Sequence, residues 1–470
     1  MSPETSSEDN GTRQDDLSAF VAATAEEFGI PGVCVGILVD GQETVASYGV
    51  TNLDHPQPVD ADTLFPLASV TKTFTATALM RLVAEGRVEL DAPVRRYVPE
   101  LELADEDAAR RITVLNLLNH TAGLEWNLVF TGDEADTLAG FVAHLPELPL
   151  IAPPGTRASY SQAGYNLAGR IVETVTGLPF EKAMAQLLLE PAGLTNTFFD
   201  LDEVMVRRFA VGHTPDGDDE QLRPARPWAS WRAGARGNNP GGGISSSVSD
   251  LLRWARFQLG TGEGVLPAEA LRHMTEQSVE LNAGPLGDGV GIGWFLREVD
   301  GVRTIGHGGS GNGQAAELLI APGRDFAVVS LANAGPHGHL FNQAVVRWTL
   351  ERHLGALERD PEPVAYDGTR AREVAGRYAI DAMNLDVADD GTRLTLAVEI
   401  KPEIRAAADA DMPADLPPAA IGFLSPGGDE YVVTEGGLTG QRGRFSRDAG
   451  GAVVGIDLAG RLFGRVPAAS

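Results

Sequence analysis

One segment of the chain, residues 64–86, limits the possible folds most strongly. Its sequence, LFPLASVTKTFTATALMRLVAEG, predicts a helix of about five turns that ends at Gly86, a frequent type of helix terminator. Apolar side chains surround most of this helix, so it should be buried inside its domain. The segment nevertheless contains Lys72, and burying an unpaired ammonium group costs several kcal/mol. A lysine at this place needs either a route to solvent or a chemical role.

Ser69 stands three residues before Lys72, so on a helix the two side chains lie on the same face. The first turn of a helix has free N–H groups and the positive end of the helix dipole, which can stabilise an oxyanion or lower the pKa of an ammonium group. A lysine that is buried beside a hydroxyl group can then accept the hydroxyl proton. The alternative is structural, with Ser69 as a helix cap and the end of Lys72 in solvent. The helix alone leaves both interpretations open.

Composition narrows the class of protein. The chain has 470 residues, of which 43% are hydrophobic, enough for a large core and for two or three domains. Its formal net charge of −28 argues against nucleic acid and anionic membranes as partners, because both are negatively charged. We find no N-terminal export signal and no apolar run long enough to span a membrane, so we expect a cytoplasmic protein without a membrane partner. The single cysteine, Cys34, excludes an intrachain disulfide, and its strand-like surroundings predict a core residue.

The apolar pattern divides the chain into four parts. Residues 1–15 are acidic and polar and predict a disordered tail, and residues 16–355 predict the main domain. Residues 356–369 contain charges and prolines and predict a linker. Residues 370–470 consist of short alternating runs separated by turn residues, which predict an all-β barrel or sandwich.

Within the main domain the order of elements is helix, strands, helices, strands, helix. This order predicts an α+β fold whose antiparallel sheet is built from both ends of the segment. The first and last helices should then cover one face of the sheet, and the helical middle should cover the other.

Three stretches of the main domain resemble the serine β-lactamase and penicillin-binding-protein superfamily, in particular its class C-like branch. They are IPGVCVGILV with the residues that follow it, the segment around SVTK at 69–72, and ITVLNLLNHTAGL at 112–124. The resemblance spans about residues 18–354. That branch includes class C β-lactamases, D-alanyl-D-alanine carboxypeptidases, D-aminopeptidases and esterases. The resemblance implies a transpeptidase-like sheet with a helical subdomain, and hydrolysis through an acyl-enzyme that needs neither a cofactor nor a metal.

The resemblance also implies a role for residues of the first two motifs. Ser69 is the nucleophile that becomes acylated, and Lys72 accepts its proton. Tyr160 passes a proton to the leaving group, and we expect a nearby ammonium group to lower the pKa of its phenol. Gln162 stands where the family has asparagine, which moves the amide by one methylene and changes its reach toward Lys72 or a substrate amide.

The third motif, Lys-Thr-Gly in many relatives, is matched by His307-Gly308-Gly309. By resemblance this strand borders the site, and its first residue, His307, is a catalytic residue that interacts with the substrate carboxylate or with the tyrosine. The backbone N–H groups of Ser69 and Ser310 form the oxyanion hole. A glycine such as Gly309 suits a strand that a substrate must approach closely. A histidine with an ordinary pKa is mostly neutral near pH 7, whereas a lysine is charged. We therefore expect neutral esters and amides to be preferred over β-lactams and carboxypeptidase substrates, which carry a carboxylate.

Other interpretations of these residues are weaker. Residues 306–311 fit the dinucleotide-binding pattern GxGxxG, but a strand-like segment follows them instead of a helix. The pentapeptide GxSxG of α/β hydrolases does not occur in the chain. His120 belongs to the NHTAG stretch and is expected to shape the turn beneath the site. Four residues of a stretch without a readable motif either bind an aromatic acid or pack the loop: Trp228, Trp231, Arg232 and Arg236.

A noncatalytic binding member of the fold would be expected to lack Ser69, Lys72 or Tyr160, and all three are present. We therefore predict a serine hydrolase that acts on a small-molecule or short-peptide substrate, an ester or amide of a small acid, D-amino acids included. The alternative is a β-lactamase or a D-alanyl-D-alanine carboxypeptidase. The sequence does not indicate an oligomeric state.

Overall fold

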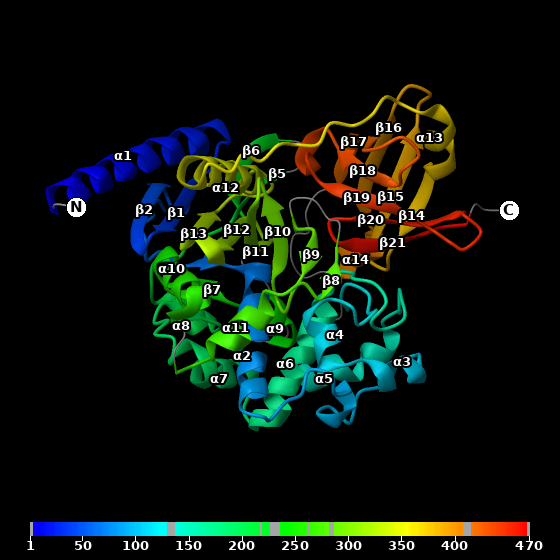
Figure 1. Cartoon of the computed structure of the whole chain (residues 1–470), viewed down its shortest axis with the longest axis horizontal. Coiled ribbons are helices and arrows are strands. Elements are labelled where there is room, and N and C mark those ends of the chain that lie inside the picture. The colour runs from blue at the N-terminus through cyan, green and yellow to red at the C-terminus, as the bar shows by residue number, and fades with distance from the viewer. Residues whose placement is uncertain are drawn as a thin grey trace.

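The computed structural model describes residues 3–128, 137–216, 219–225, 236–261, 264–281, 286–407 and 415–467. Figure 1 shows two β structures side by side, an open sheet embedded in helices and a C-terminal barrel. Among the described helices, none combines the length and the apolar character that a membrane crossing requires.

The open sheet has eight antiparallel strands in the order β2-β1-β13-β12-β11-β10-β9-β8. Its N-terminal strand β1 lies against the late strand β13, with Val33 opposite Ala332, so both ends of the main domain build one sheet. This confirms the predicted fold class. The strands are β1 (Gly32–Val39), β2 (Gln42–Gly49), β8 (Val279–Glu280), β9 (Gly289–Val290), β10 (Phe295–Val299), β11 (Val302–Gly311), β12 (Gln314–Ala321) and β13 (Phe326–Ala332).

Helices α1 (Pro3–Glu27) and α12 (His337–Leu354) cover one face of the sheet (Figure 1). Phe20 of α1 and Trp348 of α12 stack with ring centroids 4.5 Å apart. Apolar residues four apart in α1, beginning with Leu17, are buried, as expected of an amphipathic helix.

The start of α1 differs from the sequence prediction, which placed a disordered tail over residues 1–15. The helix already begins at Pro3. Two contacts hold the middle of the helix: Gln14 donates to a backbone carbonyl of β2, and Asp16 pairs with Arg352 of α12. Once packing fixes the later turns, each further residue adds one helical hydrogen bond, so the helix extends through the polar residues.

The opposite face of the sheet carries the helical region, with α2, α6 and α10 among its buried helices (Figure 1). Short strand pieces β3, β7 and β4 form a separate three-stranded sheet, and β5 pairs with β6. The helices are α2 (Thr71–Ala84), α3 (Glu106–Arg111), α4 (Val114–Leu118), α5 (Leu138–Ala143), α6 (Gln162–Thr176), α7 (Phe180–Met184), α8 (Leu201–Met205), α9 (Asn239–Gly242), α10 (Val248–Arg256) and α11 (Ala268–Met274). The small strands are β3 (Phe65–Pro66), β4 (Thr197–Phe198), β5 (His213–Asp216), β6 (Asp219–Pro224) and β7 (Ser245–Ser246).

The helix predicted over 64–86 is shorter than expected. Phe65 and Pro66 pair with β7, a 3-10 turn covers Ala68–Val70, and α2 begins only at Thr71. Pro66 lacks an N–H group, and the Leu67 N–H donates to the carbonyl of residue 244, so this part of the backbone is engaged by the neighbouring strand. The predicted end is correct, because α2 stops at Ala84 and Gly86 has a φ of 70°.

The C-terminal strands form a closed eight-stranded barrel, one of the two all-β forms that the sequence predicted. Large aromatic side chains such as Tyr378, Tyr431 and Phe445 fill its interior. The strands are β14 (Gly376–Ala379), β15 (Met383–Asp389), β16 (Leu394–Ile400), β17 (Leu416–Phe423), β18 (Glu430–Val433), β19 (Arg442–Arg447), β20 (Val453–Leu458) and β21 (Arg461–Arg465). Two helices accompany them, α13 (Gly368–Val374) and α14 (Pro402–Ala407).

Candidate active site

The three sequence motifs meet where α2, the start of α6 and the edge of β11 come together. Ser69 lies in the 3-10 turn before α2, and Lys72 is in the first turn of that helix. Ala68, directly before the serine, has a φ of 45°, a left-handed conformation that costs a residue other than glycine some strain. Such strain is maintained only where the surrounding structure fixes the turn, as it often does at functional sites.

Lys72 is fully buried, and its ammonium nitrogen has three oxygen neighbours. Nζ lies 2.7 Å from the Gly241 carbonyl oxygen, 2.6 Å from Oε1 of Gln162 and 3.3 Å from Oγ of Ser69. All three acceptors are uncharged. Burial, and then the positive charge of Arg461, lower the Lys72 pKa well below its usual value. The amine is therefore suited to take the Ser69 proton across the 3.3 Å contact.

Gln162 holds Lys72 in place despite its difference from the family pattern. Its Oε1 accepts from Lys72, while Nε2 donates to Oδ1 of Asn166 at 3.0 Å and to the Asn238 carbonyl at 3.2 Å. The extra methylene fits because Gly241 faces it: a Cβ on Gly241 would lie 2.0 Å from Nε2 of Gln162. The longer amide thus reaches Lys72 only because position 241 is a glycine and has no side chain.

The Tyr160 side chain is buried between Lys72 and Arg461. Lys72 Nζ lies 4.9 Å from the ring centroid, and so does the guanidinium carbon of Arg461. Burial raises the Tyr160 pKa to about 12, and the smaller effects of the Ser69 hydroxyl and of Arg461 lower it only in part. The expectation of a lowered tyrosine pKa is therefore wrong, because loss of hydration outweighs the nearby positive charge. Among the described residues, none completes a hydrogen bond to the phenolic oxygen.

His307 lies on β11 and is also buried. Its Nδ1 is 2.6 Å from the Gly308 carbonyl oxygen, so Nδ1 carries the hydrogen and Nε2 carries the lone pair. Within the described part of the chain Nε2 is buried without a hydrogen-bond partner. Burial and the positive charge of Lys72 lower the His307 pKa to about 3. The imidazole is thus neutral at pH 7.

The edge of β11 touches the turn that carries Ser69. A Cβ on Gly309 would lie 2.1 Å from the Leu67 carbonyl oxygen and 3.0 Å from the Ser69 nitrogen, so only glycine fits there. Strand β10 pairs with β11 only as far as Gly306, which leaves residues 307–311 with β12 as their one neighbouring strand in the sheet. Ser310 follows Gly309 along this free edge, where a substrate backbone can approach.

The sequence reasoning missed Arg461, which the barrel contributes to the site. The turn before β21 docks on the Tyr160 segment: Tyr160 N–H donates to the Gly460 carbonyl at 2.8 Å, and Leu462 N–H donates to Oγ of Ser159 at 3.2 Å. Arg461 Nε is buried and has no acceptor among the residues that the structure describes. The sequence signals a hairpin turn at DLAGRL, but it does not show which surface that turn contacts.

The remaining residues that the sequence analysis singled out either support the fold around the site or lie outside the described residues. His120, with a φ of 62°, accepts the Ser161 N–H on Nδ1 at 3.1 Å and packs on the Tyr160 ring, so it orients the tyrosine segment. Arg236 pairs with Glu181 at 2.6 Å. Trp228, Trp231 and Arg232 lie outside the described residues. In the described ranges no group of three or more histidine, cysteine or acidic side chains converges on a point where a metal ion could bind.

The chain is similar in sequence to known β-lactamases and penicillin-binding proteins. The family model described as Beta-lactamase matches residues 17–347. Penicillin-binding protein 4 of Amycolatopsis lactamdurans is 33% identical over 325 residues, which cover 67% of this chain and 83% of that protein. A Beta-lactamase of Lysobacter lactamgenus is 33% identical over 246 residues, which cover 52% of this chain and 60% of that protein.

Two solved structures match nearly the whole chain, barrel included. The crystal structure of SurE has a TM-score of 0.74 at 26% identity, with 97% of this chain and 99% of SurE covered. The octameric penicillin-binding protein homologue from Pyrococcus abyssi has a TM-score of 0.66 at 24% identity, with 96% and 99% covered, and supports the fold alone. The arrangement of an open sheet, a helical region and a barrel thus recurs in solved proteins.

Proposed function

The chain belongs to the Beta-lactamase family and is a serine hydrolase, and we propose that it works through an acyl-enzyme on Ser69. The observation that carries this proposal is the 3.3 Å contact between Ser69 Oγ and the amine of Lys72, whose pKa burial lowers well below its usual value. A neutral amine has a lone pair for the serine proton, whereas an ammonium group has none.

The proposed reaction has two halves. In the first, Ser69 Oγ bonds to the substrate carbonyl carbon while Lys72 takes the hydroxyl proton. The oxyanion is held by the backbone N–H groups of Ser69 and Ser310, and the leaving group departs with a proton delivered through Tyr160. With a pKa of about 12, Tyr160 acts as a neutral phenol that gives one proton and receives one from Lys72. In the second half, water attacks the acyl carbon in place of the leaving group. Tyr160 and Lys72 then carry a proton from this water back to Ser69 Oγ, which is released as the hydroxyl.

For the substrate we propose an ester or amide of a small acid. The neutral His307 supports a neutral group next to β11, since its imidazole offers no positive charge. D-amino acids are included among these acids, and a related protein supports them: the crystal structure of SurE with D-Leu matches this chain with a TM-score of 0.71.

A second candidate substrate is favoured by one observation. The guanidinium of Arg461, over the Tyr160 ring, supplies a cation that the third motif lacks. It suits the carboxylate of a β-lactam or of a peptide C-terminus. The alternative activity is therefore that of a β-lactamase or a carboxypeptidase.

A turnover panel tests the proposal. The enzyme is assayed with p-nitrophenyl butyrate, D-alanine p-nitroanilide and a chromogenic cephalosporin, and Ser69→Ala is assayed beside it. We expect the ester or the anilide to have the highest kcat/KM and the alanine variant to be inactive on all three. Fastest turnover of the cephalosporin would replace the proposal by the alternative, and full activity of Ser69→Ala would remove the acyl-enzyme.

A further inference from the structure

A groove of about 570 Å³ lies between the main domain and the barrel, outside the catalytic centre. This interdomain groove is walled by residues 149–157 on one side and by β14, β20 and β21 on the other. Its volume is within the roughly 300–1,000 Å³ of small-molecule sites, which are common at domain interfaces. The segment 157–161 separates it from the catalytic centre: Arg157 lines the groove, whereas Tyr160 faces Lys72.

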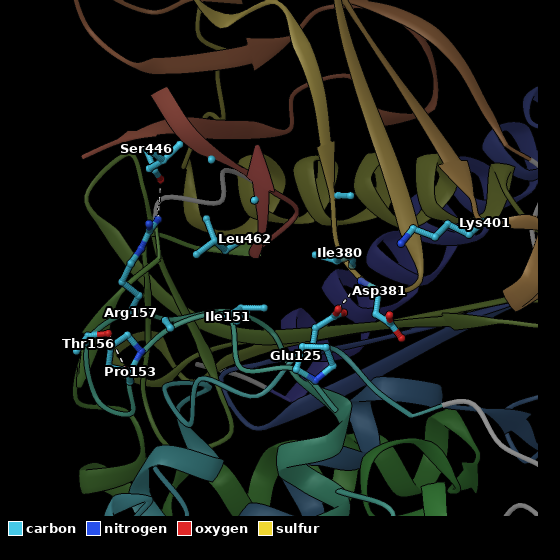
Figure 2. Close-up of a pocket in the computed structure, with 16 residues that line it drawn as sticks. Glu125, Ile151, Pro153, Thr156, Arg157, Ile380, Asp381, Lys401, Ser446 and Leu462 are labelled. Carbon is cyan, nitrogen blue, oxygen red and sulfur yellow. Dashed lines mark hydrogen bonds between the residues drawn. The ribbon is translucent and has the colours of Figure 1, made fainter. Parts of the chain in front are cut away.

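The floor of the groove is open backbone at Gly464. Gly455 of β20 stands opposite Gly464 of β21, so two neighbouring strands lack side chains at the same level. A Cβ on Gly464 would meet nothing nearer than the Ala379 carbonyl at 4.0 Å, which shows that the space above it is open. Apolar side chains surround this floor, and Figure 2 shows Ile151 and Leu462 between its two polar ends.

One polar end carries more negative than positive charge. Glu125 and Asp381 lie together there, with Lys401 near them (Figure 2). Glu125 is only 2% exposed, and its carboxylate accepts only backbone N–H groups, those of Asp381 and of Trp126. Among the described residues no lysine or arginine nitrogen lies within ion-pair distance of either oxygen, although Lys401 and Arg461 act on it over a longer range. Burial raises the Glu125 pKa, and its backbone hydrogen bonds and the positive charge of Lys401 offset this rise only in part.

The other polar end is already neutralised. Arg157 pairs with Asp457 at 2.9 Å and donates to Oγ of Ser446 at the same distance. The groove as a whole therefore has apolar walls, one end with the Arg157–Asp457 ion pair, and one end where Glu125 and Asp381 lie near Lys401. A ligand that completes this arrangement has an apolar body and one positive charge.

We propose that the interdomain groove is a second ligand site, which binds a small molecule with a primary amine on an apolar body. The amine lies at Glu125, where the carboxylate has lone pairs free to accept from it, and the body lies over Gly464 and against Leu462. Both a free amine and the N-terminus of a short apolar peptide have this chemistry.

The test measures binding by calorimetry with 4-phenylbutylamine, its neutral analogue 4-phenylbutan-1-ol, its anionic analogue 4-phenylbutyrate, and leucyl-leucinamide for the peptide source. Ser69→Ala protein is used so that no probe is turned over. We expect the amine to bind at least about 10-fold more tightly than the alcohol, the order of one charge-assisted hydrogen bond. Tighter binding of the alcohol or of 4-phenylbutyrate would overturn the proposal, and comparison of the two amines identifies the source.

Variants locate the binding. Gly464→Leu fills the groove, and since its Cβ is unobstructed we expect the fold to persist and amine binding to fall at least about 10-fold. Gly323→Leu is the matched control, because its Cβ also meets nothing within 4 Å and it lies in a turn of the main domain. Glu125→Gln should reduce the affinity of the amine to that of the alcohol, which keeps the proposal testable if Gly464→Leu does not fold. Unchanged affinity in both variants would place the amine elsewhere, for example in the catalytic centre.

Discussion

The main domain and the barrel contribute to the site in different ways. The main domain supplies Ser69, Lys72, Tyr160 and β11, all within segments whose sequence carries a motif. The barrel supplies one hairpin turn, with Gly460 bound to the Tyr160 backbone and Arg461 against its ring. The proposed chemistry is thus concentrated in the main domain, while the barrel adds the positive charge of Arg461 beside it. Substitutions in the two halves should therefore have effects on activity that differ in size and in kind.

The largest effect should come from Ser69→Ala. Because the hydroxyl is the group that forms the proposed acyl-enzyme, we expect kcat/KM on the best substrate to fall by roughly 10⁴-fold or more. A fluorophosphonate probe followed by peptide mass spectrometry should label Ser69 in the parent enzyme and nothing in the variant. Cys34, with its thiol buried and its pKa raised by burial, provides no second nucleophile. Labelling of any other residue would contradict the assignment.

Next in size are Lys72→Met and Tyr160→Phe. Each removes a proton carrier, and we expect each to slow acylation by about 10²-fold or more. The two residues are proposed to act on the same proton, so the double variant should lose less than the product of the two single losses. Pre-steady-state release of p-nitrophenol measures the acylation rate directly. Losses that multiply in full would show that the residues act independently.

A smaller effect of another kind is expected from Arg461→Met, the variant in the barrel. Arg461 lowers the Lys72 pKa, so its removal should raise that pKa and move the acidic limb of the kcat/KM profile to higher pH. If the guanidinium also binds a carboxylate, the kcat/KM ratio of cephalosporin to p-nitrophenyl ester should fall by about 10-fold, as for one charge-assisted hydrogen bond.

Arg377→Met is the control for the Arg461 variant. Arg377 is an exposed barrel residue that pairs with Asp386 at 2.7 Å, and exposed pairs contribute little. Its profile and its substrate ratio should match those of the parent enzyme. Equal behaviour of the two variants would show that the barrel has no electrostatic effect on the site.

The same contrast explains what could be predicted from the sequence. Repeating patterns predicted the sheet built from both ends and an all-β barrel or sandwich at the C-terminus, because such patterns follow from local geometry. The position of Arg461 depends on how two domains pack, and no local pattern encodes that. The Tyr160 pKa was misjudged for a related reason: the sequence showed a nearby charge, but the depth of burial that outweighs it is a property of the assembled structure.

The smallest expected effect concerns stability at the contact between the two halves. Asp457 of β20 pairs with Arg157, yet burial raises its pKa from 3.8 to about 6. A carboxyl whose pKa is higher in the folded state stabilises the fold most when it is protonated. Its contribution is complete below about pH 4, the unfolded value, and is lost as the pH rises through about 6.

Asp457→Asn removes this titration. As the pH rises from about 4.5 to about 7.5, the free energy of unfolding of the variant should therefore increase relative to that of the parent, by at most about 3 kcal/mol for a shift of this size. Urea denaturation followed by tryptophan fluorescence measures the difference. Asp429→Asn is the control within the barrel. Burial raises the Asp429 pKa, but the larger combined effect of Arg447 and Arg370 lowers it, so that the net pKa lies below the ordinary value of 3.8. Its difference from the parent should stay constant over the same pH range, because Asp429 is ionised throughout. If the Asp457 difference is equally constant, the Arg157–Asp457 contact between barrel and main domain does not titrate in this pH range.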